Sequence, residues 1–138
     1  MKSRKKSGSR NITNMSQDVI SDALNKMLNA IKAGKDRISV IRHSKQLLSV
    51  LAIAKLKGYV KSYRVENNVL NIEIGKLNYC QVIKPRFVVQ VSEIEKYVKR
   101  YLPAREIGTI VISTSQGLMT HRTAEEKNLG GCLIAYFY

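Results

Sequence analysis

The sequence contains few cysteines, which cross-link small extracellular domains, and no long apolar run of the kind that spans a membrane. Its 138 residues include two cysteines, Cys80 and Cys132, two prolines, two histidines and no tryptophan. Because no short pairing motif joins the cysteines, we expect reduced thiols inside the cell rather than a disulfide framework. No stretch approaches the ~18 consecutive apolar residues of a membrane span. Met1 is followed by charged residues rather than by the apolar stretch of a signal peptide. We therefore expect a soluble intracellular protein.

Acidic residues are also scarce, and none precedes Asp18. The chain has 24 Lys and Arg against 10 Asp and Glu, which gives a net charge of +14 and a pI near 10.0. Five of the 24 cations precede Asp18, so residues 17–138 still hold 19 cations against the 10 acids. Such an excess of positive charge disfavours the compact state by self-repulsion unless an anionic partner neutralises it. Nucleic acid is the first partner to consider, and a generically soluble basic protein is the alternative.

The patterns of common enzyme and metal sites are missing. His43 lies between Arg42 and Lys45, whose charges disfavour a protonated imidazole, and His121 lies beside Arg122 at the start of a predicted short helix. No nucleophile motif surrounds either histidine, so both are interpreted as loop residues or RNA contacts. Cysteine and histidine spacing does not fit zinc, and no phosphate-binding or dinucleotide-binding glycine loop occurs. We therefore predict no enzyme activity, no metal, no cofactor and no small-molecule substrate.

Residues 1–15 are predicted to form a basic, disordered arm. Residues 1–14 carry Lys, Arg, Ser and Asn with no acid and little apolar content, so they cannot bury enough surface to fold alone. Such an arm would become ordered, if at all, on RNA. A mitochondrial presequence has a similar composition, but this stretch lacks an apolar face, so that interpretation ranks second.

Residues 16–75 are predicted to form an N-terminal α/β lobe. Apolar residues recur at helical spacing in two segments, and alternate in the stretches between and after them. Asn67-Asn68 tolerates positive φ and predicts a hairpin turn. The expected elements are a helix over 16–33, a strand over 37–42, a helix from Ser44 to Gly58, and hairpin strands over 59–66 and 69–74.

Residues 76–138 are predicted to form a C-terminal lobe that is rich in strands and has short helices, which makes the fold α+β. Pro85 interrupts a strand-like stretch and predicts an edge strand or a bend. Ser92 and Glu95 have the spacing of a capping box at the start of a helix. The expected elements are a strand over 81–91, a helix ending before Pro103, a strand over 109–113, a short helix over 120–128 and a terminal strand over 132–137.

The segment Ser113-Thr114-Ser115-Gln116-Gly117 places three hydroxyl residues after an apolar strand, and a glycine that permits close backbone approach. Hydroxyls and amides can bind the sugar 2′-OH groups, phosphates and base edges of A-form RNA or of a distorted stem. A Ser-rich turn that caps the next helix fits the spacing equally well. The residues alone leave both interpretations open.

Several motifs resemble the universal small-subunit ribosomal protein eight family, in its archaeal and eukaryotic branch. The strongest is the segment from Gly108 to His121, Gly-Thr-Ile-Val-Ile-Ser-Thr-Ser-Gln-Gly-Leu-Met-Thr-His, followed by Ala124 and Gly130-Gly131. The upstream motifs are Gly75-Lys-Leu-Asn78, Ile83-Lys-Pro-Arg-Phe87, Tyr101-Leu-Pro-Ala-Arg105, Ser21-Asp-Ala-Leu24, Asn29-Ala30 and Ser44-Lys45. The resemblance covers residues 16–138 and leaves only the basic arm outside it.

The resemblance implies a two-lobed α/β fold and a protein that binds an irregular stem in the central domain of small-subunit ribosomal RNA early in assembly. It implies a cytoplasmic ribosome, with the mitochondrial ribosome as the alternative, and neighbouring small-subunit proteins as further partners. The implied RNA contacts are Ser113, Thr114, Ser115, Gln116 and Gly117, with Asn29, Lys35, Ser44, Lys45, Lys84 and Arg86 added from the remaining motifs.

Three other functions are possible for a protein of this net charge, and none of them accounts for the family motifs. A free-standing RNA-binding protein or translational repressor would share the basic surface. An RNA-modifying enzyme would need an acid–base pair, metal cluster or cofactor loop, and the sequence offers none. A protein that binds membrane surfaces through the arm would need an amphipathic anchor, which is also absent.

Overall fold

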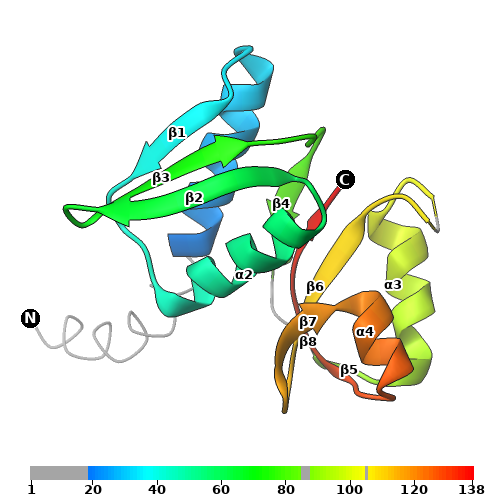
Figure 1. The fold of residues 1–138 in the computed structure, drawn as a ribbon. Helices are drawn as coiled ribbons and strands as arrows, with labels where there is room; N and C mark the ends of the chain where they lie inside the picture. The colour runs from blue at the N-terminus through cyan, green and yellow to red at the C-terminus, as the bar shows by residue number, and fades with distance from the viewer. Residues whose placement is uncertain (1–18, 85–87, 105) are drawn as a thin grey trace, which may run out of the picture.

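The computed structural model describes residues 19–84, 88–104 and 106–138. Within these ranges, helices and antiparallel sheets form two neighbouring bodies (Figure 1), so the predicted α+β class is confirmed. The predicted basic arm, residues 1–15, lies outside the described residues. The predicted proline interruption at Pro85 and the candidate contact Arg86 lie outside them as well.

The first sheet has three antiparallel strands in the order β1-β3-β2. Its strands are β1 (Arg37–Val40), β2 (Val60–Glu66) and β3 (Val69–Ile74). Asn67 and Asn68 join β2 to β3 at φ angles of 52° and 63°, which confirms the predicted hairpin. The predicted strand over 37–42 is also confirmed, although β1 ends at Val40.

Two helices cover one face of this sheet (Figure 1). The first is helical at residues 19–32, and the second is α2 (Lys45–Leu56). Strand β3 shows why they pack there, because Leu70 and Ile72 are buried while Asn71 between them is exposed. The buried helix residues include Leu24, Met27, Leu47 and Leu51, all in the same apolar cluster as Leu70.

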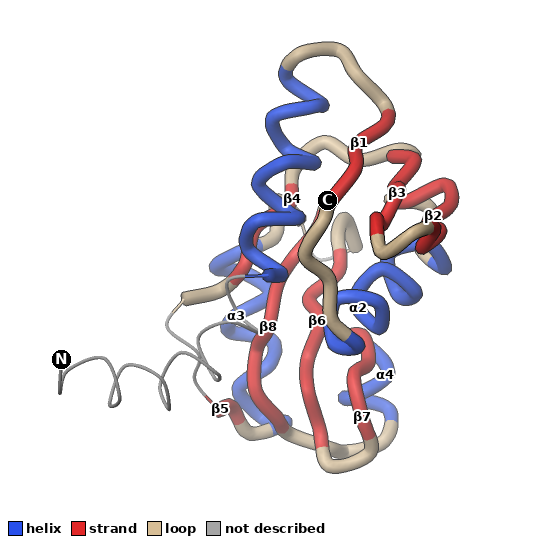
Figure 2. The backbone as a smooth tube through the Cα atoms, turned by 90° about the vertical axis from the view of Figure 1, so that its left-hand side faces the viewer, coloured by secondary structure: helices blue, strands red, loops and turns tan. Residues whose placement is uncertain are grey.

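The second sheet is built around its last strand. It has the order β4-β8-β6-β7, and β5 also pairs with β8. The strands are β4 (Cys80–Val82), β5 (Val88–Val89), β6 (Thr109–Thr114), β7 (Gly117–Thr120) and β8 (Gly131–Phe137). Figure 2 shows β8 between β6 on one side and β4 and β5 on the other. The predicted edge strand is thus two short pieces, and β7 was not predicted.

Helices α3 (Ile94–Tyr101) and α4 (His121–Glu126) belong to the second body. The predicted capping box of Ser92 and Glu95 is wrong. A 3₁₀ turn, η1 (Val91–Glu93), precedes α3, and the Glu93 carboxylate accepts a hydrogen bond from the Gln90 amide at 3.0 Å. Because the chain turns directly after β5, the box forms two residues earlier than the spacing of Ser92 and Glu95 indicates.

The two bodies share one apolar cluster. Val111, Ile134 and Phe137 of the second sheet are buried in the same cluster as Leu24 and Leu70 of the first body. The Tyr59 and Phe137 rings stack across this junction, with centroids 5.8 Å apart and an interplanar angle of 12°. The opposite face of the second sheet forms a second cluster with α3 and α4, which contains Ile94, Val98, Ile110, Ile112, Ala124 and Leu133.

We predict that Leu70→Ala lowers the free energy of unfolding by about 2–5 kcal/mol, because it removes a fully buried side chain and leaves a cavity. Val65 is the direct cross-strand partner of Leu70 but is 41% exposed, so Val65→Ala should cost less than about 1 kcal/mol. Urea unfolding checks both. Similar losses for the two variants would contradict the observed core.

Candidate nucleic-acid interface

The hydroxyl-bearing segment is the turn of a β-hairpin. Thr114 at the end of β6 pairs with Gly117 at the start of β7, so Ser115 and Gln116 form the two-residue tip. Gly117 has a φ of 109°, in the region that favours glycine, and the space where a Cβ would lie is open. Ser115, Gln116 and Gly117 are all exposed. The tip is therefore accessible to a partner.

The three hydroxyls of the turn have different roles. The Thr114 hydroxyl donates to the Gly117 carbonyl oxygen at 2.9 Å and accepts from the Gln116 amide at 3.1 Å, so it holds the turn together. In contrast, the hydroxyls of Ser113 and Ser115 form no hydrogen bond with any other described residue. Ser113 is half-buried and Ser115 is exposed. Ser115 thus offers a donor and an acceptor to solvent or to RNA.

The interpretation of this segment as a cap for the next helix is wrong. Thr120, after β7, is the N-cap of α4, and its hydroxyl accepts from the Thr123 amide at 3.2 Å. The strand β7 separates the serines from the helix. Its four residues include the partly buried Leu118 and the buried Met119, and they pair fully with β6, so the segment continues as a strand before the helix begins.

Gly130 and Gly131 pack closely against strands β5 and β6. Gly131 of β8 lies so close to β6 that a Cβ there would collide with the Ser113 carbonyl oxygen. A Cβ at Gly130 would meet the Val89 carbonyl oxygen at 2.6 Å. These close approaches explain why glycine occupies both positions.

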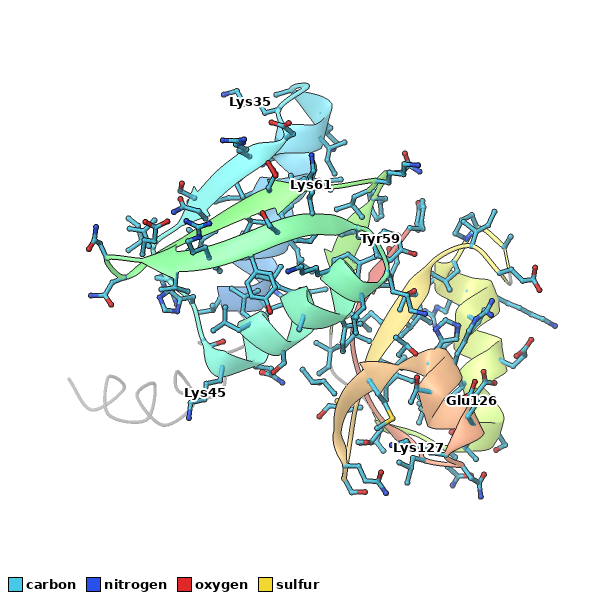
Figure 3. All side chains as sticks on the ribbon, viewed as in Figure 1. Lys35, Lys45, Tyr59, Lys61, Glu126 and Lys127 are labelled. Atoms are coloured by element: carbon cyan, nitrogen blue, oxygen red, sulfur yellow. The ribbon has the colours of Figure 1, made fainter. Side chains whose placement is uncertain are left out.

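Lys127 is a cation near the turn that the sequence analysis missed. It is the C-cap residue of α4. Its ammonium lies 3.5 Å from the Gln116 side-chain oxygen, and Figure 3 shows it at the end of the second body. The only signal in the sequence was a lysine following a short helix, which does not reveal that α4 folds back alongside the β6–β7 hairpin.

The candidate contacts in the first body do not form one site. Lys35 and Lys45 are exposed at opposite ends of that body (Figure 3). Asn29 is exposed on the N-terminal helix. Ser44 is the N-cap of α2, where its hydroxyl accepts from the Leu47 amide at 3.2 Å, so it already has a structural role. Lys84, in the second body, is exposed after β4.

The two histidines differ. His43 lies in the loop before α2, as predicted. His121 is the first residue of α4, within the predicted short helix, but it is only 3% exposed, so the interpretation as an RNA contact is wrong. Its Nδ1 accepts a hydrogen bond from the Ile110 amide at 3.1 Å. Burial, assisted by the positive charge of Arg122, lowers the pKa of His121 from its ordinary value of 6.5.

Cys80 and Cys132 are both free thiols. Burial raises the pKa of Cys80 to about 12, and its Sγ lies 3.4 Å from the Leu24 carbonyl oxygen, so it belongs to the apolar interior. Over the described ranges, no group of three or more His, Cys, Asp or Glu is placed to hold a metal ion. Nor is any described helix long and apolar enough to cross a membrane.

These features define a basic α+β protein with an exposed, hydroxyl-bearing hairpin turn. The sequence matches the Ribosomal protein S8 family over residues 18–138, and the chain belongs to this family. It is therefore a structural ribosomal protein rather than an enzyme, in a family that binds ribosomal RNA.

Curated relatives are similar over almost their whole length. Small ribosomal subunit protein uS8 of Nanoarchaeum equitans is 40% identical over 129 residues, which cover 90% of this chain and 100% of the relative. Two proteins of Schizosaccharomyces pombe, small ribosomal subunit proteins uS8A and uS8B, are each 35% identical over 128 residues. These cover 88% of this chain and 98% of each relative.

The environment of His121 predicts a pH dependence of stability. The folded protein resists protonation of this ring while the unfolded chain does not, so stability is complete above pH 6.5 and falls as the pH drops below it. The slope is at most about 1.4 kcal/mol per pH unit. In urea unfolding between about pH 7 and pH 5, His121→Gln should flatten the slope. Equal slopes for wild type and His121→Gln would contradict this.

Proposed function

We propose that this protein is a constituent of the small ribosomal subunit that binds small-subunit ribosomal RNA directly and organises its central domain during assembly and translation. The RNA target is an irregular stem, and the contact is the turn from Ser113 to Gly117. The observation that carries the proposal is the exposed Ser115 hydroxyl, held on a turn whose shape Thr114 stabilises from within. The relatives' names support the subunit.

In this proposal, charge and shape have separate tasks. The net charge of +14 supplies affinity, because each Lys or Arg that neutralises a phosphate releases condensed counterions. That attraction is the same for any RNA. The turn supplies selectivity, because hydroxyl and amide groups on a two-residue tip can fit the 2′-OH groups and base edges of one distorted stem.

The remaining expectations belong to the same proposal. The chain divides into two lobes at residues 75 and 76, with the principal RNA contact in the second. Asn29, Lys35, Ser44, Lys45, Lys84 and Arg86 contribute secondary contacts, and neighbouring small-subunit proteins pack on the free surfaces. An archaeal relative at 40% identity favours a cytoplasmic ribosome over a mitochondrial one.

We predict that Ser115→Ala weakens the complex with the central-domain stem by about 1–2 kcal/mol, because a hydrogen bond to a desolvated partner is lost. Binding to random RNA of the same length should hardly change. Filter binding with both RNAs measures the two affinities.

Ser62 provides the matched control for this experiment, since it is an exposed serine on the first sheet. Ser62→Ala should leave both affinities unchanged. The Ser115 hydroxyl bonds to no described residue, so Ser115→Ala should shift the free energy of unfolding by less than about 0.5 kcal/mol. Equal losses on specific and random RNA would overturn the selective role of the turn.

We predict that Lys127→Gln reduces the slope of log affinity against log salt by about 1, because the cation beside Gln116 is placed to contact one phosphate. Lys61, exposed on β2 of the first sheet (Figure 3), is the control. Lys61→Gln should keep the wild-type slope on the central-domain stem. The same slope for Lys127→Gln and wild type would place this cation away from the RNA.

A further inference from the structure

Five of the seven tyrosines gather on one surface of the second body, and they come from three separate segments of the chain. This tyrosine cluster comprises Tyr79, just before β4, Tyr97 and Tyr101 of α3, and Tyr136 and Tyr138 at the end of β8. All five side chains are half-buried. None of them belongs to the hairpin turn or is among the RNA contacts proposed above.

The rings form a nearly parallel array. Neighbouring centroids lie 5.1–6.4 Å apart and interplanar angles are 16–35°. The sequence of contacts runs Tyr97 to Tyr101 (6.4 Å, 16°), Tyr101 to Tyr136 (5.1 Å, 30°), Tyr136 to Tyr138 (6.4 Å, 17°) and Tyr138 to Tyr79 (5.4 Å, 25°). Such an arrangement presents several aromatic faces and edges with a common orientation.

Packing accounts for only part of this array. The rings of Tyr97, Tyr101, Tyr136 and Tyr138 border the second apolar cluster and shield it from water. Leucine or isoleucine would serve that purpose as well. Tyrosine adds a flat surface and a polar tip that remain useful where the side chain is only half covered, as at binding surfaces.

Two of the tyrosine hydroxyls in the cluster are hydrogen-bonded to Gln81. The Gln81 side-chain oxygen accepts hydrogen bonds from the hydroxyls of Tyr79 at 2.5 Å and Tyr136 at 3.3 Å. Burial, followed by the proximity of Tyr79, raises the pKa of Tyr136 to about 12, so this hydroxyl remains a donor. The Gln81 amide nitrogen donates to no other described residue, and Gln81 is exposed. It can therefore donate to the edge of a base.

Cations border the same surface. The Lys96 ammonium lies 5.9 Å from the centroid of the Tyr97 ring, and the Arg100 guanidinium lies 5.7 Å from that of Tyr101. The neighbouring carboxylates have other contacts, because Glu93 of η1 accepts a hydrogen bond from the Gln90 amide and Glu95 of α3 lines a cavity beside His121. The margin of aromatic rings along α3 is thus positive.

We propose that the tyrosine cluster is a second RNA-binding surface, on which an unpaired nucleotide stacks its base while Lys96 and Arg100 bind the adjoining phosphates. Aromatic side chains are the usual platforms for unstacked bases, and neighbouring cations hold the backbone. Charge complementarity favours RNA over a protein partner, because a protein partner would need acidic groups opposite Lys96 and Arg100.

This surface is separate from the hairpin turn. Ile110, next to Tyr136 across the sheet, and Ser115 lie five residues apart along the β6 hairpin, which is about 17 Å at ~3.4 Å per residue. The two surfaces can therefore engage different parts of one folded RNA. The inference rests on the proposed function only in taking RNA as the partner, and it does not require the turn to contact RNA.

The test uses the full chain and two single-stranded RNA probes of about ten nucleotides. One is an adenosine oligomer, and the other has the same backbone with every base removed. Wild type should bind the adenosine oligomer more tightly and lose tyrosine fluorescence on binding. The double variant Tyr97→Leu with Tyr101→Leu should lose roughly 10-fold or more in affinity for the adenosine oligomer and keep its affinity for the abasic one.

Three further variants make the result specific. Tyr63→Leu removes a half-buried tyrosine of the first sheet, whose ring lies 6.0 Å from the Lys55 ammonium, and should bind like wild type. Tyr97→Phe with Tyr101→Phe should retain stacking and affinity. Ser115→Ala should leave oligomer binding intact, so failure of the turn and failure of the cluster are distinguishable. Equal wild-type affinity for both oligomers, or equal losses on both in the leucine variant, would overturn the proposal.

Discussion

The structure depends on one strand whose two edges and two faces are all occupied. Strand β8 pairs with β6 on one edge and with β4 and β5 on the other. Leu133 faces the cluster under α3 and α4, while Ile134 and Phe137 face the cluster shared with the first body. A strand buried in this way loses hydrogen bonds and apolar contacts together if it is displaced, so it connects the stability of both bodies.

Strand β8 also supports the candidate RNA-binding turn. The Ser113 carbonyl lies directly against Gly131 of β8, and the tip is closed by the Thr114 hydroxyl. Side chains on strands are held more firmly than those on long loops, which suits recognition by shape. The first body contributes cations on scattered elements, and these suit attraction rather than selection.

Local features of this fold could be predicted from the sequence, and features set by packing could not. The Asn67-Asn68 turn and the alternation around Leu70 follow from neighbouring residues. The four-residue strand β7 and the buried position of His121 depend on contacts with β6, which local patterns do not encode. In the candidate site, the residues left two interpretations of the segment from Ser113 to Gly117 open and the family resemblance favoured RNA. Only the geometry distinguishes Thr114, which holds the turn, from the accessible Ser115. Lys127 required knowledge of where α4 lies.

The pairing pattern also has a kinetic consequence. In the first sheet, β2 and β3 are joined by two residues, so their hairpin closes with little loss of chain entropy. In the second sheet, Cys80 pairs with Phe137, which requires closure of a much longer loop. Non-local pairing of this kind slows folding. The β2–β3 and β6–β7 hairpins are therefore expected to close before Cys80 meets Phe137, so the second sheet is completed only when its C-terminal strand is in place.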